Sequence, residues 1–561
     1  MRKIFLLLTL FAFSANMLAQ KTYSNEEFTV KFGFPYEIPK GHQDLGYFGN
    51  PEQGFAQLSY EPQKELSIQN FDKNLKAIKE KTIDIKNFPD DFISDAFFVI
   101  GDKYYWFFST FNKDDRKESL WAQEINLQKG ELVGKRKELL KNTELEGDLV
   151  SLGGFKVAKG NKYQFHSSLD SSKILITYRP LHKSKNDAVN KEQVAFCVID
   201  KGLNILDKNI IDMPYTEKKM DVSDYNVDSQ GNSFLLAKVY GDGETKEKDK
   251  KKQKFHYEVF RIQHGTGELK KIKLDTETKF ITDILTSEQI TGDMVIGGFY
   301  SNKKQGKDGG WSWNNDKETS SDGVFLLKID VNGNPLSYGK GYYEFPAEIL
   351  KQFMSAKQQK KLEKKEKDED LEAKNMVMRY IVSNKDGSME VIGEEYSEVT
   401  RTSYNGTSSR STTYYTYEDI LDMRIDASGQ MMWIKKIPKR QVAEVSSYGY
   451  GGMSSHLKII GSMSFSRYSD GLNTYLFYTD NIKNLNLAMD KEPALHRDGM
   501  GGYLMYFKID KNGEVSKGDL FDYKKESIKF NPIDFQNIGN KTMVNRAFKG
   551  KQSRVVLLNQ K

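Results

Sequence analysis

The stretch LKIDVNG at residues 327–333 recurs, with variations, along most of this chain. In it, two apolar residues flank a charged one, an Asp follows, and a short polar turn ends on Gly. Close copies are MRIDASG at 423–429 and FKIDKNG at 507–513. Weaker copies lie at 68–72, 124–126, 197–200 and 261–263, and an eighth copy is VLLN at 556–559. Self-similarity at a period of tens of residues indicates one supersecondary unit that is used repeatedly.

The residues around these copies follow the pattern of a β-hairpin. The turn VDSQGN at 227–232 is followed by the apolar run 233–240, and SNKDG at 383–387 is followed by 388–394. Asp and Asn bond their own backbone in turns, and Gly accepts a positive φ. The runs after such turns tend to alternate apolar with polar residues, as half-buried strands do. Thirty tyrosines and 34 phenylalanines also favour strands.

The spacing of the copies predicts an all-β fold, a seven- or eight-bladed β-propeller over residues 26–559. The marker positions are 72, 126, 200, 263, 330, 426 and 510, and their spacings run from 54 to 96 residues. A four-stranded blade needs about 40 to 50 residues, so the additional residues of each repeat would lie in long loops. The copy at 556–559 would add an eighth blade, which a strand near Phe28 to Phe32 would close. The alternative is ordinary hairpins in two or three unrelated β domains.

With these turns, the chain resembles secreted bacterial β-propeller proteins that have degenerate Asp-x-x-Gly blade turns. The resemblance covers most of residues 26–559 and implies the fold. The segment DASGQMMW at 426–433 is similar to the Asp-box of sialidase-like propellers but lacks the Ser-x-Asp-x-Gly-x-x-Trp spacing. The repeated Gly-His and Trp-Asp pairs of Trp-Asp-repeat propellers are also missing from the sequence. A fold does not by itself imply a function.

The N-terminus has the pattern of a secretory signal peptide at residues 1–19. Arg2 and Lys3 supply the positive charge, and residues 4–15 are a mostly apolar run that is too short to span a membrane. Cleavage after Ala19 would leave Gln20 as the first residue, and an uncleaved anchor is the alternative. No later segment approaches the roughly 18 consecutive apolar residues of a membrane span. We therefore expect an exported protein, periplasmic or extracellular.

Cysteine count and charge exclude several classes of protein. Cys197 is the only cysteine, so neither an internal disulfide nor a multi-cysteine zinc site can form. No Cys stands near residue 20, which disfavours a lipoprotein anchor, and the apolar surroundings of Cys197 predict a buried structural thiol. Eighty-four basic against 78 acidic residues give a net charge of +6. So small an excess supports neither nucleic-acid binding nor strong membrane attraction.

Residues 346–374 are predicted to form one inserted, charged helix. Pro346 suits the first helical position, and Ile349, Leu350, Phe353 and Met354 form an apolar stripe at helical spacing. Residues 357–370 are almost all Lys, Glu, Asp and Gln. The helix would be either a projecting arm that binds a partner or a solvated helix packed at its root on a blade.

Five further stretches are predicted to be insertions or loops. The charged run 245–254 would form a hairpin tip, for which polyanion binding is an open alternative. The stretch 402–417 is rich in Ser, Thr and Tyr, and together with 314–321 it could face one rim of the ring. The Gly-rich stretches 448–452 and 499–502 lack the context of a phosphate-binding loop.

Motifs for catalysis or metal binding are missing from the sequence. No His-Glu-x-x-His and no Gly-x-Ser-x-Gly occurs. On an ideal strand, His256 and His264 would share a face but stand about 25 Å apart, too far for one metal. The Asp-x-Asn-Gly turns at Asp330 and Asp510 offer too few oxygens for calcium and are interpreted as turn stabilisers. We therefore assign no catalytic, cofactor-binding or metal-binding residues and expect no cofactor.

These observations favour an exported β-propeller that serves as a binding or scaffold protein, with a protein, peptide or glycan as its partner. The basis is a repeat scaffold that carries long polar insertions. The alternative is a propeller hydrolase or lyase acting on an extracellular polymer, since residues from several blades can gather around a central channel and escape a linear search. Whether the protein is an enzyme stays open. A third possibility is an envelope structural component with the 346–374 arm as its contact.

Overall fold

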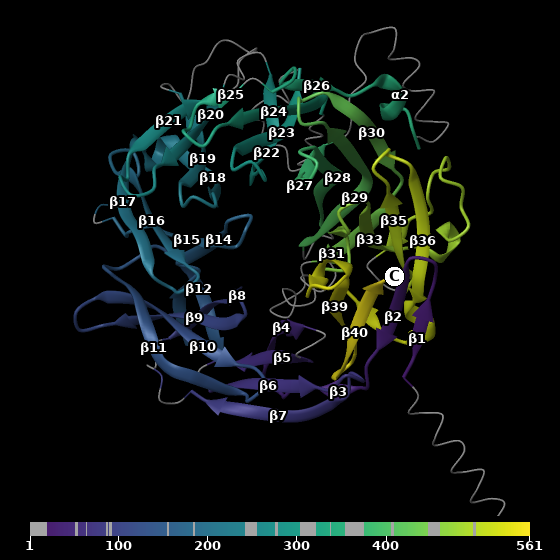
Figure 1. The fold of residues 1–561 in the computed structure, drawn as a ribbon, viewed down its shortest axis with the longest axis horizontal. Coiled ribbons are helices and arrows are strands. Elements are labelled where there is room, and N and C mark those ends of the chain that lie inside the picture. The colour runs from purple at the N-terminus through teal and green to yellow at the C-terminus, as the bar shows by residue number, and fades with distance from the viewer. Residues whose placement is uncertain are drawn as a thin grey trace, which may run out of the picture.

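A computed structural model describes residues 20–50, 54–62, 64–85, 88, 92–153, 156–182, 184, 186–241, 255–274, 279–302, 321–336, 338–353, 375–404, 409–446, 461–497 and 501–561. Within these residues the chain is an all-β propeller, in which antiparallel sheets are arranged around a ring (Figure 1). This confirms the predicted fold class of seven or eight blades. No helix among the described residues is long and apolar enough to cross a membrane.

Seven sheets are each built mainly from one continuous stretch of chain, with the first strand toward the centre of the ring and the fourth at its outside (Figure 1). The first four contain β4 (Gln43–Asn50), β5 (Gly54–Glu61), β6 (Glu65–Phe71) and β7 (Ala77–Asp84); β8 (Ile93–Ile100), β9 (Lys103–Asn112), β10 (Lys117–Asn126) and β11 (Glu131–Asn142); β14 (Tyr163–Ser167), β15 (Lys173–Tyr178), β16 (Lys191–Asp200) and β17 (Ile205–Thr216); β18 (Met220–Val227), β19 (Ser233–Tyr240), β20 (Phe255–Ile262) and β21 (Leu269–Lys273). Between the second and third of these lies a separate hairpin of β12 (Asp148–Gly153) and β13 (Lys156–Gly160).

The other three sheets carry additional strands or longer connections. They contain β22 (Phe280–Glu288), β23 (Met294–Ser301), β24 (Gly323–Ile329), β25 (Pro335–Leu336) and β26 (Tyr342–Glu344); β27 (Met376–Ser383), β28 (Met389–Tyr404), β29 (Ser409–Ile425), β30 (Met431–Ile437), β31 (Gln441–Ser446) and β34 (His496–Arg497); β32 (Phe465–Ser469), β33 (Thr474–Asp480), β35 (Tyr503–Ile509) and β36 (Val515–Asp522). The described helical turns are η1 (Glu217–Lys219), α2 (Ala347–Leu350), η3 (Ile482–Asn484), α5 (Tyr523–Glu526) and η4 (Pro532–Asp534).

Both ends of the chain share the sheet that closes the ring. It contains β1 (Thr22–Ser24), β2 (Phe28–Phe32), β3 (Tyr36–Glu37), β37 (Lys529–Phe530), β38 (Gln536–Asn537), β39 (Thr542–Lys549) and β40 (Gln552–Gln560). β2 pairs antiparallel with β40, so the predicted closing strand near Phe28 to Phe32 and the eighth copy of the repeat are confirmed. The Phe28 ring, which is fully buried, contacts Tyr475 and Tyr506 edge to face with centroids 4.9 and 5.2 Å apart.

The repeated sequence marks the same place in each sheet, the turn between the third and fourth strands. At Asp330 the carboxylate accepts hydrogen bonds from the backbone N–H of Asn332 (2.9 Å) and Asn334 (2.7 Å). Asp426 and Asp510 bond their own turns in the same way. Gly333 has a φ of 77°, which a side chain would oppose. The Asp is therefore a turn stabiliser, as the sequence predicted.

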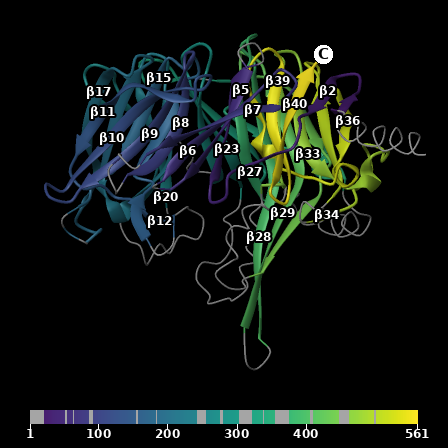
Figure 2. The ribbon, with the colours of Figure 1, turned by 90° about the horizontal axis from the view of Figure 1, so that it is seen from below.

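Strand alternation sorts the connections onto two rims of the ring. The turns between third and fourth strands contain only four to six residues, and we call their side the turn rim. On the opposite side, which we call the insertion rim, the second strands β15, β19, β23 and β33 end, and 12 to 22 residues separate each from the third strand of its sheet. β12 and the long β28–β29 hairpin lie on this same side (Figure 2). The β28–β29 hairpin contains the insertion at 402–417, while residues 314–320, which were expected to face the same rim, lie outside the described residues.

The predicted insertion at 402–417 belongs to a β-hairpin, which the structure describes at residues 402–404 and 409–417. β28 and β29 continue as a pair from Tyr396 opposite Tyr417 to Tyr404 opposite Ser409, and β31 pairs with the other edge of β29 from Thr412 to Tyr417. We call this projection the β-arm (Figure 2). Thr and Tyr residues favour this conformation, because β-branched and aromatic side chains are suited to strands. The insertions at 245–254, 314–320 and 448–452 lie outside the described residues.

The predicted helix over 346–374 is confirmed only in its first turn, α2. Pro346 precedes this turn as its N-cap and does not occupy the first helical position: its carbonyl accepts from the N–H groups of Ile349 and Leu350. Ile349 and Leu350 are buried against the ring. Phe353 then adopts a φ of 62°, a left-handed conformation that a helix cannot continue through. Residues 354–374, including Met354, lie outside the described residues.

Within the described residues, each sheet shares a cluster of buried apolar side chains with the next sheet around the ring. Phe196 and Val198 of β16, for example, pack with Leu235 of β19 in the neighbouring sheet. Full burial of such a side chain contributes about 1.5–3 kcal/mol. The core is therefore a ring of interfaces between sheets.

Asp470 joins the last continuous sheet to the closing sheet, and its loss should weaken ring closure. Partial burial opposes its ionisation, but hydrogen bonds from Asn473 and from Gln560 of β40 outweigh burial and lower the pKa of Asp470 to about 2 from 3.8. Its stabilising effect is therefore complete above about pH 4 and is lost as the pH falls through about 2. We expect Asp470→Asn to lower the free energy of unfolding by about 1–2 kcal/mol at pH 7.

Urea unfolding at pH 7 and at pH 2 measures this effect, and the difference between wild type and variant should shrink at the lower pH. Asp490→Asn is the control, because Asp490 is exposed and pairs with its neighbour Lys491. Equal losses for the two variants at pH 7 would contradict the role of Asp470.

Candidate functional site

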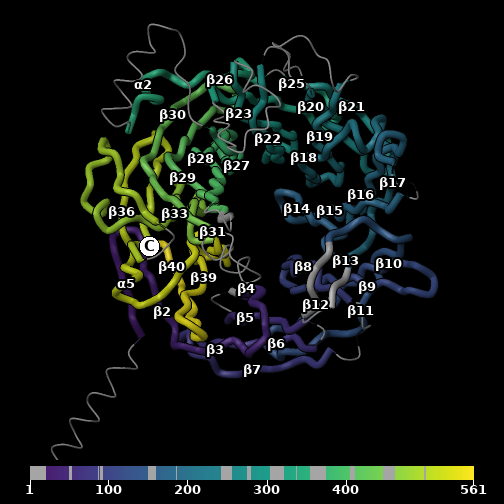
Figure 3. Tube along the Cα trace, turned by 180° about the vertical axis from the view of Figure 1, so that it is seen from behind, coloured from purple at the N-terminus to yellow at the C-terminus, as the bar shows by residue number. Residues whose placement is uncertain are grey.

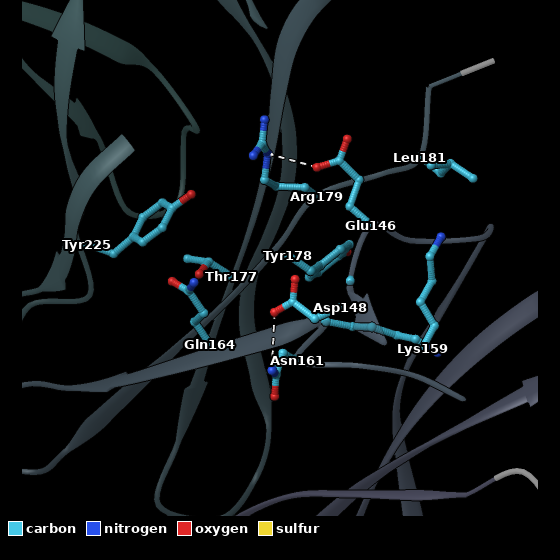
Figure 4. Close-up of a pocket in the computed structure, with 12 residues that line it drawn as sticks. Glu146, Asp148, Lys159, Asn161, Gln164, Thr177, Tyr178, Arg179, Leu181 and Tyr225 are labelled. Carbon is cyan, nitrogen blue, oxygen red and sulfur yellow. Dashed lines mark hydrogen bonds and ion pairs between the residues drawn. The ribbon is translucent and has the colours of Figure 1, made fainter. Parts of the chain in front are cut away.

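The insertion rim contains a pocket of about 480 Å³ at the base of the β12–β13 hairpin (Figure 4). It lies between the β12–β13 hairpin and the sheet β14–β17 and reaches the inner strand β18 of the next sheet. Figure 3 shows the hairpin next to β8, the inner strand of the neighbouring sheet, with which β13 is in contact. The residues that line it are Glu146, Gly147, Asp148, Lys159, Asn161, Lys162, Gln164, Thr177, Tyr178, Arg179, Leu181 and Tyr225.

Two connecting segments run side by side to form one wall of the pocket. The N–H of Glu146 donates to the carbonyl of Arg179 (2.9 Å), and the N–H of Leu181 donates to the carbonyl of Glu144 (3.0 Å). Pro180, which has no N–H to donate, lies opposite Leu145 in an isolated bridge between these hydrogen bonds. This pairing brings Glu146 and Arg179 together although 33 residues separate them in the sequence.

Arg179 is held between two carboxylates. Its Nε lies 3.3 Å from Glu146 in the pocket wall, and its Nη2 donates to the buried Glu192 over 2.5 Å. Burial raises the pKa of Glu192, while the Arg179 guanidinium opposes that rise. On the facing side, burial raises the pKa of the Tyr225 phenol, which therefore stays neutral (Figure 4). The wall thus offers a fixed cation and a neutral hydroxyl group.

A buried ion pair supports the floor of the pocket. Lys162 Nζ lies 2.7 and 2.8 Å from the two oxygens of Glu118, and both side chains are almost fully buried. Burial raises the pKa of Glu118, and the hydrogen bond from Lys162 opposes this effect. Burial also raises the pKa of the nearby Asp95 to about 7. Breaking such a pair would leave one charge uncompensated, so Lys162 serves to hold the pocket in shape.

The arrangement is suited to holding a polar ligand. Asp148 and Gln164 are exposed, and Asp148 is bonded to Asn161 over 3.2 Å. Carboxylate, amide and hydroxyl groups can together match the donors and acceptors of a peptide or sugar. Among the lining residues that the structure describes there is no His, Ser or Cys, so these residues do not form a Ser–His or Cys–His pair.

Sequence reasoning did not find this pocket, because its residues come from four separate stretches of chain. Only a correct pairing of residues 144–146 with 179–181 could have placed Glu146 beside Arg179. Cys197 is buried as predicted, and burial raises the pKa of its thiol to about 12. It is therefore a poor nucleophile at neutral pH.

The histidines do not gather at the pocket. His256 contacts Glu258 over 3.0 Å, while His264 bonds Asp207 of the neighbouring sheet, so the two do not share a site, as predicted. Burial lowers the pKa of His166 on β14. His182 lies 3.6 Å from Glu217, and His496 is buried. His456 lies outside the described residues.

His42 lies away from the pocket and close to two carboxylates, those of Glu61 and Glu65. In the described part of the chain, His42, Glu61 and Glu65 are the one group of three or more side chains whose spacing would suit a metal ion. The sequence analysis assigned no metal ligand, and these residues carry no recognisable motif. They meet through strand pairing in the sheet β4–β7.

No protein-family model matches the chain, and no curated protein matches it. Similar solved structures include the WD40 domain of SCAP from fission yeast, at 10% identity, with 94% of this chain and 98% of that chain covered and a TM-score of 0.32. Another is the β-propeller domain of the Trilobed protease from Pyrococcus furiosus, at 10% identity, with 75% and 93% covered and a TM-score of 0.27. At such identities and scores the likeness concerns the propeller fold, and nothing about function follows from it.

Lys162 and Lys159 offer a matched test of the pocket floor. Lys162→Met would leave Glu118 buried without a counter-charge, and we expect it to lower the free energy of unfolding by about 3–5 kcal/mol. Lys159 lies in the same pocket, but its contact with Glu144 is 3.8 Å long and more exposed. Lys159→Met should therefore cost less than about 1 kcal/mol. Urea unfolding of both variants measures the difference, and similar losses would show that the Lys162–Glu118 pair is not structural.

Proposed function

We propose that this chain is an exported β-propeller that binds a protein, peptide or glycan partner at its insertion rim. The observation that carries the proposal is the division of the ring into two unlike rims. One rim has short, self-bonded turns, while the other gathers the long connections, the pocket and the β-arm (Figure 2). Loops placed on a rigid scaffold are where binding residues concentrate.

The β-arm supports a scaffold role, because its base is firmly held. Arg379 of β27 bonds Glu394 of β28 over 2.6 Å, and its guanidinium lies over the Tyr396 and Tyr417 rings. Glu394 also pairs with Lys439 over 2.7 Å, with both side chains fully buried. A projection anchored in this way keeps its direction and can present its surface to a partner without a large loss of conformational entropy.

Hydroxyl groups continue along the β-arm. Thr400 bonds Thr413 over 2.9 Å, and Thr402 bonds Ser411 over 2.8 Å. Arg401 lies over the Tyr414 ring at 5.4 Å, which adds a charged and aromatic contact surface. Tyr and Arg are enriched at protein interfaces. The β-arm therefore suits a protein or peptide partner, while the pocket supplies a second, smaller contact.

A propeller hydrolase or lyase acting on an extracellular polymer remains the alternative hypothesis. The pocket contains Glu146 and Asp148, the residue types that glycoside hydrolases use. Glu146 pairs with Arg179, and Asp148 accepts a hydrogen bond from Asn161. These contacts orient the two carboxylates, as a binding site requires. Binding is the function that these contacts support better.

A pull-down from envelope and medium fractions with the purified mature chain tests the proposal. We expect a stoichiometric partner, and we expect Asp148→Asn together with Gln164→Ala to weaken its capture by about tenfold, since each exposed hydrogen-bonding side chain contributes roughly 0.5–1.5 kcal/mol. Asp212→Asn is the matched control: Asp212 is exposed on the outer strand β17 and, like Asp148, accepts one hydrogen bond from a side-chain amide.

Capture that is unchanged in the pocket variants but lost when the β-arm is shortened would assign binding to the β-arm alone. Turnover of a polymer that Asp148→Asn abolishes would overturn the binding proposal and establish the enzyme. Glycan screening with the same variants distinguishes a sugar ligand from a protein partner.

Export is the second part of the proposal, and we expect cleavage after Ala19. Gln20 and Lys21 already belong to the folded ring, because Gln20 donates to the carbonyl of Asn74 and Lys21 pairs with Glu526 over 2.9 Å. N-terminal sequencing of the chain recovered from periplasm or medium should begin at Gln20. Recovery from the membrane fraction with Met1 still present would support the uncleaved anchor.

A further inference from the structure

A histidine and two glutamates meet at the insertion rim of the sheet β4–β7, away from the pocket. His42 directly precedes β4, Glu61 ends β5, and Glu65 begins β6. One ligand atom from each lies within 4.8 Å of the other two. The three residues belong to segments that strand pairing fixes, so their approach follows from the register of the sheet.

The His42 ring is oriented by the sheet beneath it. Its side chain is 1% exposed, and its Nδ1 lies 3.0 Å from the hydroxyl of the buried Ser59. Its Nε2 points to the carboxylates, 2.9 Å from Glu65 Oε1 and 4.0 Å from Glu61 Oε2. A hydrogen-bond partner on one ring nitrogen is what orients a metal-binding histidine and leaves the other nitrogen for the metal.

The two carboxylates face each other across the β5–β6 turn. Glu61 and Glu65 are direct partners in the strand register. Like charges placed opposite each other on neighbouring strands destabilise a hairpin unless a cation lies between them. Lys64 pairs with Glu61, but its side chain is 64% exposed and lies outside the group of three. A cation held between the carboxylates would remove this repulsion more effectively than a mobile surface lysine.

The backbone beside the carboxylates leaves room for them. Gly41 has a φ of 91°, and a Cβ at this position would lie 2.9 Å from Glu61 Oε1. A side chain at position 41 would therefore displace the Glu61 carboxylate from its present place. The glycine lets the chain turn and pass close to the carboxylate at the same time.

From this geometry we propose that His42, Glu61 and Glu65 bind a divalent transition-metal ion of the zinc class. Zinc bonds to nitrogen and oxygen are about 2.0–2.2 Å long, which places neighbouring donor atoms roughly 3–4 Å apart. An imidazole favours zinc over calcium, which takes about six to eight oxygens. The Glu61 and Glu65 side chains are 21% and 36% exposed, so an ion can enter from solvent.

Three protein donors leave at least one coordination position open. Structural zinc sites are closed by four protein ligands, whereas three ligands leave room for water or for an anionic group of another molecule. The site lies on the same rim as the pocket and the β-arm. The inference is independent of the proposed function, since it requires only the three side chains and their register.

Equilibrium dialysis of the mature chain against Zn²⁺, after removal of metal with a chelator, tests the site. We expect one tightly bound ion per wild-type chain. His42→Ala and Glu65→Gln should each weaken binding by about tenfold or more, since even indirect partners of a metal contribute that much. His256→Ala is the matched control, because His256 also lies 3.0 Å from a glutamate but outside this group of three, and it should bind as the wild type does.

Binding of Co²⁺ gives a second readout through its visible absorption, which reports nitrogen and oxygen ligation. Glu65→Gln changes a partly exposed side chain, so its fold can be verified by an unchanged melting temperature in the presence of chelator. A wild-type chain that binds no ion, or variants of His42 and Glu65 that bind as the wild type does, would overturn the proposal.

Discussion

The antiparallel pairing of β2 with β40 is the interaction on which the rest of the ring depends. It joins residues more than 500 positions apart, from Phe28 opposite Gln560 to Phe32 opposite Val556. Without it, two sheets would expose their apolar faces, and the edges of unpaired strands would invite aggregation. The entropy cost of closing a loop grows only slowly with the number of residues in it, so this closure costs little more stability than a shorter one would. Contacts so far apart in the sequence do, however, form slowly during folding.

Closure also explains why the two rims differ. Every sheet packs its apolar faces against both neighbouring sheets. Large insertions within the strands would therefore disrupt this packing. Strand alternation leaves only the connections free, and it places the short Asp turns on one side and the long connections on the other. The Asp turns are compact because each carboxylate bonds the backbone of its own turn, as at Asp330 and Asp426. The rim opposite them is where sequence can vary without disturbing the ring.

The repeat could be predicted from sequence because its signals are local. A turn such as 330–334 contains its own Asp, Asn and Gly, and the closing strand at Phe28 to Phe32 alternates apolar and polar residues. The helix at 346–374 was predicted from Pro346 and from an apolar stripe at helical spacing, local features that cannot show that Phe353 adopts a left-handed conformation. The composition of 402–417 indicated an insertion, but it could not show that its two sides pair as the β-arm.

The pocket and the histidine site could not be predicted, since their residues meet only through pairing. Glu146 reaches Arg179 through the bridge between Leu145 and Pro180. His42 lies 19 and 23 residues before Glu61 and Glu65, a separation with no recognised metal motif. The pairing register of the strands places these residues, which are distant in the sequence, next to one another. A shift of that register by one residue would turn the side chains of the shifted strand to the opposite face of the sheet. Local patterns therefore specify the ring, while its rim chemistry depends on long-range register.

Buried charges at the insertion rim fit this division of roles. The pairs Lys162–Glu118 and Lys439–Glu394 are almost completely enclosed, one beneath the pocket and the other at the base of the β-arm. A buried ion pair contributes little net stability compared with an apolar pair of the same size, but breaking it is costly, so it restricts the geometry of its surroundings. The first pair thus restricts the geometry of the pocket and the second that of the β-arm, and both features lie on the insertion rim. The apolar interfaces between sheets stabilise the ring, whereas the buried ion pairs fix the geometry of the surfaces that a partner would contact.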